Sequence, residues 1–204
     1  DRLTALPLHA RSSDDLADGV NRMIAVIPEF LPIVNARTAN ITRGDPDVLN
    51  CLTLARLAAD LREYAGQLGS RFTGALAMHR ALTLEEQLAI ERTQGRIDQL
   101  RSMIETRVAT PSTLNQHAVA TLGAQYFGDG LRYVAAARAK ASQPGGVDIT
   151  PAAFAERYVP TMRAITDFRD IVLGLADDDI RQHRREMLLV LVGSAGAVLS
   201  LLGA

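Results

Sequence analysis

The chain of 204 residues contains no tryptophan, few aromatic residues (4%) and one cysteine, Cys51. A single cysteine excludes an internal disulfide and cannot by itself supply a thiolate metal site. We expect Cys51 to fill a small apolar position in the core. Strands require runs of alternating β-branched or aromatic residues, and no such run is present. The sequence therefore excludes a disulfide-stabilised fold and argues against a β-sheet protein.

An excess of charge of either sign is also lacking. The formal net charge is −1, and acidic and basic residues alternate along the whole chain, with Lys140 as the only lysine. A protein that binds nucleic acid presents a broad basic face to the phosphates, and this pattern offers none. We therefore expect no nucleic-acid partner. The hydrophobic content of 48% is high enough for a folded core.

Sequence motifs for catalysis and for metal binding are missing as well. There is no phosphate-binding glycine loop and no nucleophile elbow. The glycines Gly66, Gly69 and Gly74 lie in a leucine-periodic segment, where we interpret them as positions of close helix packing. The histidines lie on different segments, without the spacing of metal ligands: His9, His79, His117 and His183. We predict no metal, no cofactor and no enzymatic activity.

Helical periodicity is present throughout the chain. Apolar residues recur at steps of three and four, as on the buried face of an amphipathic helix. The predicted inward-facing residues include three series: Leu54, Leu57, Leu61, Tyr64, Leu68, Phe72 and Ala75; Leu88, Ile97, Leu100, Ile104 and Val108; and Phe154, Tyr158, Met162, Ile165, Val172 and Leu175. Asp45–Pro46, the capping box of Thr83 and Glu86, and Thr150–Pro151 are typical helix starts. The predicted helices cover about residues 16–34, 46–81, 83–108, 114–134 and 151–180.

Five amphipathic helices joined by short turns predict an all-α fold, an antiparallel up-and-down helical bundle. An odd number of antiparallel passes leaves the two ends of the domain at opposite ends of the bundle. Both ends could then not meet the same membrane. Several sites could be either kinks or reversals, and two shorter bundles stacked end to end would satisfy the count equally well. These sites are Pro28, Pro32, Thr110–Pro111, Gly128–Gly130 and Pro160.

The chain ends in a long apolar run. From Met187 onward its 18 residues carry no charge, and a helix of that length reaches about 27 Å, close to the ~30 Å of a bilayer core. A buried core helix is the alternative, but such helices seldom lack a polar face. We therefore predict a helical-bundle domain over residues 1–183 and a transmembrane helix over residues 184–204, as a fragment of a longer chain.

Three stretches carry a resemblance to a known class of proteins. They are "LREYAGQLGSRFTGALAMHRALT", "AQYFGDGLRYVAAA" and "DITPAAFAERYVPTMRAITDFRDIVLGL", the last followed at once by the apolar run. This order resembles the extracytoplasmic all-helical sensor domains of bacterial transmembrane receptors, of the nitrate/nitrite-sensing type or the four-helix-bundle type of chemoreceptors and histidine kinases. The resemblance covers Leu61 to Ala204.

The resemblance implies a ligand-sensing input domain in the periplasm, anchored in the bacterial inner membrane and paired as a homodimer. A small anion or a periplasmic partner protein would bind the bundle, and the last helix would pass a shift to a cytoplasmic output domain. The alternative is a membrane-anchored or membrane-inserting helical protein that is complete at Ala204, such as a scaffold or a toxin.

Two arginines fall where the apolar seams call for apolar residues. Stepping on from Val34 places Arg37 inward, with Asn40 nearby, and Arg71 follows Leu68 at the expected apolar step. A guanidinium near a bundle core needs a carboxylate of the protein or an anion from outside, unless it reaches past the seam to water. With Arg62 and Tyr64 added, the candidate ligand-binding residues are Arg37, Asn40, Arg62, Tyr64 and Arg71. The candidate anions, nitrate or a carboxylate, follow from the resemblance.

Overall fold

A computed structural model describes residues 22, 25, 48–108, 116–143 and 148–202, with the backbone alone described for residues 193–202. Every regular element in these ranges is a helix, and none of the described residues lies in a strand. The predicted all-α fold is therefore confirmed. The predicted helix over residues 16–34, apart from two of its positions, and the predicted start at Asp45–Pro46 lie outside the described residues.

The predicted helix over residues 46–81 is divided into two. Helix α2 spans Leu49–Ser70 and α3 spans Thr73–Ala77, with a turn at Arg71 and Phe72 between them. The prediction of one continuous helix as far as Ala81 was therefore wrong, but the predicted inward-facing residues of this segment are largely confirmed. Those that are fully or almost fully buried are Leu54, Leu57, Leu61, Leu68, Phe72 and Ala75.

Helix α4 (Leu84–Val108) begins at the predicted capping box. The Glu86 backbone N–H donates to Thr83 Oγ1 at 3.2 Å, and the Thr83 N–H donates to Glu86 Oε2 at 2.8 Å. Glu86 also forms an ion pair with Arg80. The prediction that Leu88 lies on the buried face was wrong, because the buried stripe through Ile90 and Ile97 reaches Glu86 in the first turn, and Leu88 is exposed.

The two remaining rods of the bundle are continuous through their irregular segments. One consists of α5 (Gln116–Leu122), the π-helix η2 (Gly123–Gly130) and α6 (Leu131–Ala141). The other consists of α7 (Pro151–Tyr158), the 3₁₀ segment η3 (Val159–Met162) and α8 (Arg163–Leu202). The chain therefore does not reverse at Gly128–Gly130 or at Pro160. The predicted cap of α7 is confirmed, since the Ala153 N–H donates to Thr150 Oγ1 at 3.1 Å.

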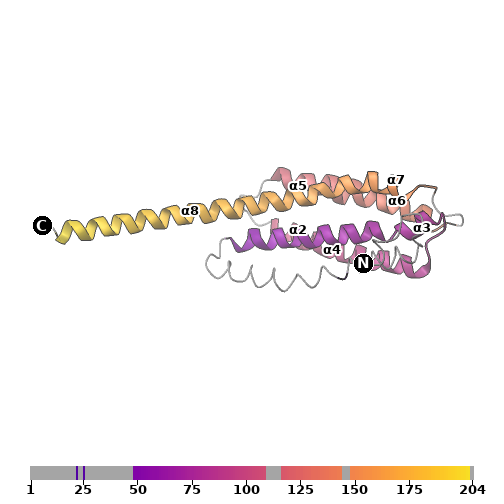
Figure 1. The fold of residues 1–204 in the computed structure, drawn as a ribbon, viewed down its shortest axis with the longest axis horizontal. Helices are drawn as coiled ribbons and strands as arrows, with labels where there is room; N and C mark the ends of the chain where they lie inside the picture. The colour runs from indigo at the N-terminus through magenta and orange to yellow at the C-terminus, as the bar shows by residue number, and fades with distance from the viewer. Residues whose placement is uncertain (1–21, 23–24, 26–47, 109–115, 144–147, 203–204) are drawn as a thin grey trace, which may run out of the picture.

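The described helices pack as one antiparallel bundle, in which α2 lies against both α4 and α8 (Figure 1). The Leu82 N–H donates to the Ala141 carbonyl at 2.8 Å, which places the start of α4 and the end of α6 at the same end of the bundle. Helix α3 also contacts α7 at this end. Successive rods therefore run up and down, and α8 leaves from the opposite end (Figure 1).

Helix α8 extends far beyond the other helices. Its first part contributes Ile165, Phe168, Val172 and Ala176 to the core, whereas all residues from 180 to 192 are exposed. Over the residues whose side chains are described, no helix combines the length and the apolar character needed to cross a membrane. The predicted span over 184–204 extends into residues 193–204, whose side chains lie outside that description.

Candidate functional site

The five candidate ligand-binding residues are not gathered in one place. Arg37 and Asn40 lie outside the described residues. Arg62 and Tyr64 lie on α2, and Arg71 is its C-terminal cap. Positions two apart on a helix point in nearly opposite directions, and nine positions separate Arg62 from Arg71 by about half a turn and roughly 13 Å. These three residues therefore do not share a single ligand within one chain.

Tyr64 and Arg71 have separate surroundings. The Arg96 guanidinium of α4 lies over the Tyr64 ring, 5.2 Å from its centroid, and its Nη1 donates to the Tyr64 hydroxyl at 3.4 Å. Tyr64 therefore joins α2 to α4. Arg71 is half-buried, and its buried Nε atom finds no hydrogen-bond partner among the described residues.

Two buried tyrosines form a hydrogen-bonded chain at the centre of the bundle. The Tyr158 hydroxyl donates to the Ala65 carbonyl of α2 at 2.9 Å, and the Tyr126 hydroxyl lies 3.3 Å from the Tyr158 hydroxyl. A phenol has one hydrogen to donate. Because Tyr158 donates to Ala65, Tyr126 must donate to Tyr158. The chain thus fixes η2, α7 and α2 relative to one another.

Burial determines the ionisation of this pair. It raises the pKa of Tyr158 to about 12, although the hydrogen bond from Tyr126 and the charge of Arg62 both act to lower it. Burial also raises the pKa of Tyr126. The neighbouring Tyr158 raises it further, through its charge and through the hydrogen bond that Tyr126 donates to it. Loss of hydration penalises the phenolate in both cases. Both hydroxyls therefore remain neutral at physiological pH and act as structural hydrogen-bonding groups.

The two irregular helical segments lie against each other beside this pair. A Cβ atom on Gly130, the last residue of η2, would lie 2.6 Å from Thr161 Oγ1 in η3, so only glycine fits there. Such π-type turns within helices are frequent at functional sites, because they change the direction of the side chains that follow. Here the π-helix η2 packs against η3, the 3₁₀ segment through which α7 passes into α8.

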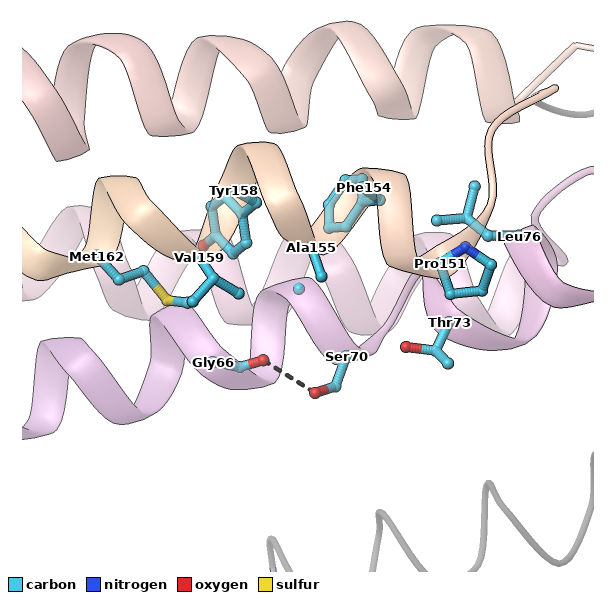
Figure 2. A pocket seen from close by; sticks show the side chains of 11 residues that line it. Gly66, Ser70, Thr73, Leu76, Pro151, Phe154, Ala155, Tyr158, Val159 and Met162 are labelled. Atoms are coloured by element: carbon cyan, nitrogen blue, oxygen red, sulfur yellow. Dashed lines mark hydrogen bonds between the residues drawn. The ribbon is translucent and has the colours of Figure 1, made fainter. Parts of the chain in front are cut away.

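A small pocket opens next to Tyr158, between α2 and the α7–η3 segment (Figure 2). Gly66, Gly69 and Ser70 form its α2 side, and Phe154, Tyr158 and Met162 lie opposite. Its volume is about 150 Å³. A Cβ atom on Gly69 would lie 2.9 Å from the Tyr158 ring, which confirms the predicted close packing at this glycine.

Arg62 lies at one end of the pocket. It precedes Gly66 by one helical turn on the same face of α2, and its Nη1 is 3.2 Å from where a Gly66 Cβ would be. None of the three predicted residues that the structure describes lines the pocket, but the Arg62 side chain reaches Gly66, which does. The apolar spacing of Phe154, Tyr158 and Met162 predicts core residues but does not predict a pocket between them and α2. The glycines Gly66 and Gly69 were the only signal for it.

No group of three or more potential metal ligands occurs among the described residues. No protein-family model matches the chain, and searches of curated proteins and of solved structures find nothing similar to it. The arrangement of the described residues must therefore carry the functional argument. It offers a small pocket with one adjacent cation at the point where the last helix begins.

Proposed function

We propose that the chain is the ligand-sensing input domain of a bacterial transmembrane receptor, with its bundle in the periplasm and its last helix in the inner membrane. The observation that carries this proposal is the form of α8. One uninterrupted helix runs from Arg163, inside the bundle, to Leu202, far outside it (Figure 1). A helix of this kind links a binding domain mechanically to whatever surrounds its far end.

The exposed part of α8 includes a wide apolar surface, whose contact with water is unfavourable. The six consecutive residues Met187–Val192 are between 51% and 73% exposed, and six residues more than encircle a helix. Soluble proteins expose single apolar side chains, but a wide apolar surface marks an interaction site or a membrane contact. The sequence remains apolar to Ala204. Together with the resemblance to sensor domains, this pattern supports a membrane-spanning segment.

The proposed signal is a small displacement of α8 relative to α2. The pocket is bounded by α2 on one side and by η3, the segment that leads into α8, on the other. A ligand between them would favour one of two packing arrangements, and shifts of packed helices of about 1–2 Å are a common way to switch a protein. The continuous helix would carry this shift to an output domain.

Membrane fractionation tests the anchoring step. The full chain, expressed in a bacterium, is expected in the membrane fraction and resistant to extraction at high pH. Introducing Leu189→Arg and Val192→Arg together is expected to move most of it to the soluble fraction, because arginine within a bilayer costs about 2.5–3.5 kcal/mol per residue on insertion scales. The matched control introduces Leu84→Arg and Leu88→Arg, two exposed leucines of α4, and should remain in the membrane. A parent chain found in the soluble fraction would contradict the proposal.

The orientation has its own test. Asp148 is exposed in the segment before α7, so an Asp148→Cys substitution in a Cys51→Ala background places a single thiol on the bundle. A membrane-impermeant maleimide added to intact spheroplasts should label it. Labelling that requires lysis would place the bundle in the cytoplasm, against the proposal.

Signal transfer is tested with a chimera. The chain is joined after Ala204 to the cytoplasmic kinase portion of a bacterial receptor, and residues are inserted one at a time after Gln182, outside the bundle. Each inserted residue rotates the rest of a helix by about 100°. Kinase output is expected to vary periodically with the number inserted, whereas constant output would argue against transmission through α8.

We also propose a homodimer formed through the outer face of α8. Leu173, Ile180 and Met187 are exposed apolar residues spaced by seven, the spacing that brings side chains to one seam of a helix pair. Oxidation of Leu173→Cys or Ile180→Cys in a Cys51→Ala background is expected to give disulfide-linked dimers. Gln182→Cys, on the opposite face, is the control. Equal crosslinking at all three positions would contradict a specific interface.

A further inference from the structure

We propose that the pocket between α2 and the α7–η3 segment binds a small monocarboxylate with a compact apolar body, and that Arg62 binds its carboxylate. This inference deepens the proposed function, because it names the ligand class of the same sensor. The binding itself is measured without any membrane or signalling readout. Its failure and the failure of the proposed function are therefore distinguishable.

The shape of the pocket sets the size of the body. Gly66 and Gly69 leave Ser70 as the one side chain among the α2 residues that line the pocket, and the facing wall is formed by Phe154, Tyr158 and Met162 (Figure 2). The volume of about 150 Å³ equals that of an engineered protein cavity that accepts benzene. A six-membered aromatic ring or a short branched alkyl group therefore matches the volume of the pocket.

The walls favour an apolar body. The Tyr158 hydroxyl donates to the Ala65 carbonyl at 2.9 Å, and the Ser70 hydroxyl donates to the Gly66 carbonyl at 3.0 Å (Figure 2). With both hydrogens already used, these side chains offer a ligand no further hydrogen to accept. A polar group placed among Phe154, Ala155 and Met162 would lose its hydration without compensation.

Arg62 supplies a positive charge at the end of the pocket where Gly66 and Met162 lie. It is one turn before Gly66 on the same face of α2, and its Nη1 passes 3.2 Å from the position of a Gly66 Cβ. Its charge also acts on the Tyr158 hydroxyl at the pocket wall. Among the described residues, no carboxylate forms an ion pair with Arg62. A guanidinium in this position is suited to bidentate binding of a carboxylate.

Charge and volume together select the ligand. Acetate or nitrate would satisfy Arg62 but leave the apolar pocket empty. A dicarboxylate would place its second charge among apolar side chains, where an unpaired charge is costly. A neutral molecule would fill the pocket but leave the guanidinium unpaired. Only a monocarboxylate with a ring or a branched chain satisfies both features.

The test uses the detergent-solubilised full chain with ¹³C-labelled methionine methyl groups. Met162 lines the pocket, whereas Met78 and Met103 lie elsewhere and are exposed. Benzoate and 3-methylbutanoate are expected to shift the Met162 signal in a saturable way and to leave the Met78 and Met103 signals in place. Benzyl alcohol should bind at least tenfold more weakly than benzoate, and acetate should cause no shift of Met162.

Variants separate the charge from the volume. Arg62→Met retains the aliphatic stem and should weaken benzoate binding at least tenfold without changing the binding of benzyl alcohol. Arg132→Met, an exposed arginine of α6, is the matched control and should bind as the parent does. Ala155→Leu fills the pocket from α7 and should abolish binding of both probes. Gly66→Leu does the same from α2, where a Cβ meets only the flexible end of Arg62.

Three results would overturn the proposal. One is a Met162 signal that none of the probes shifts. Another is benzoate binding that Arg62→Met leaves unchanged, since the carboxylate would then have another partner or none. The third is benzoate binding that survives in both Ala155→Leu and Gly66→Leu, which would place the ligand outside this pocket.

Discussion

The two halves of α8 belong to the same helix but have opposite surroundings. In the inner half, Ile165, Phe168, Val172 and Ala176 form one buried stripe. Polar or charged residues occupy four of the eight positions between them, at Thr166, Asp167, Arg169 and Asp170. In the outer half, Met187–Val192 are apolar on every side and exposed on every side. The inner half satisfies the rule for a helix on the surface of a soluble core. The outer half does not.

The difference shows that amphipathic periodicity, rather than apolar content, determines which part of a helix joins a bundle. A helix packs against its neighbours along one stripe, and the bundle has no means of covering the other sides. An apolar segment without a polar face therefore has to find a different environment.

Removing a large side chain from each half should give opposite results. Phe168 is 1% exposed and Leu189 is 73% exposed. Phe168→Ala is expected to lower the free energy of unfolding by about 3–5 kcal/mol, the usual cost of a buried cavity of this size. Leu189→Ala should change it by less than about 0.5 kcal/mol. Urea denaturation in detergent, followed by circular dichroism, measures both, and equal losses would show that the outer half is also part of the folded core.

The hydroxyl of Tyr158 fixes the segment from which α8 starts. Tyr158→Phe leaves the buried Tyr126 hydroxyl without its acceptor and removes the bond to the Ala65 carbonyl. We expect a loss of about 1–3 kcal/mol, the cost of an unsatisfied buried group. Tyr126→Phe is the milder control, because the bond from Tyr158 to Ala65 remains. Equal denaturation midpoints for Tyr158→Phe and the parent would show that the hydroxyl chain contributes nothing to stability.

The same pair predicts an alkaline transition. The pKa of Tyr158 rises from 10.0 to about 12 in the folded protein. A raised pKa favours the neutral form, so this contribution is complete below pH 10 and is lost as the pH rises from about 10 through 12. The free energy of unfolding should therefore fall steeply over that interval. The double variant Tyr126→Phe, Tyr158→Phe should be less stable at pH 8 and should show a shallower fall.

A pair of glycines tests how closely the helices pack on the pocket side of α2. A Cβ on Gly69 would lie 2.9 Å from the Tyr158 ring, whereas nothing lies within 4 Å of a Cβ on Gly95 in α4. Gly69→Ala is expected to cost about 1 kcal/mol net, because forced repacking outweighs the better helix propensity of alanine. Gly95→Ala should stabilise the protein by about 0.5–1 kcal/mol. Thermal unfolding of the two variants should shift in opposite directions, and a shared direction would contradict the close contact.

The all-α fold and the starts of α4 and α7 could be predicted because they depend on neighbouring residues. The Thr83–Glu86 box and the Thr150 cap are local motifs whose partners lie three residues away. The seam of α2 follows from residue spacing alone. Leu88 was assigned to the wrong face because Glu86, a polar residue, occupies the inward position in the first turn of α4.

The candidate site depended on contacts between distant parts of the chain. The pocket requires Gly66 of α2 to face Met162, and the hydroxyl chain joins Tyr126, Tyr158 and Ala65. No local pattern gives the relative height of two helices in a bundle, so neither feature could be derived from the sequence. The triplet Gly128–Gly130 predicts either a kink or a reversal, and nothing in the sequence indicates the π-helix over Gly123–Gly130.

The smallest expected effect concerns Gly174, near the end of the inner half of α8. Gly174 is exposed, and nothing lies within 4 Å of the position that its Cβ would occupy. Gly174→Ala should therefore stabilise the chain by about 0.5–1 kcal/mol, because alanine loses less backbone entropy in a helix. Hydrogen exchange of the amides between Val172 and Ile180 should slow by the factor that corresponds to this free energy, since local fraying of the helix becomes less favourable. The Phe168 region, held by packing, should exchange as before. If exchange slows equally along the whole helix, the two halves unfold together, and the contrast between them does not extend to their dynamics.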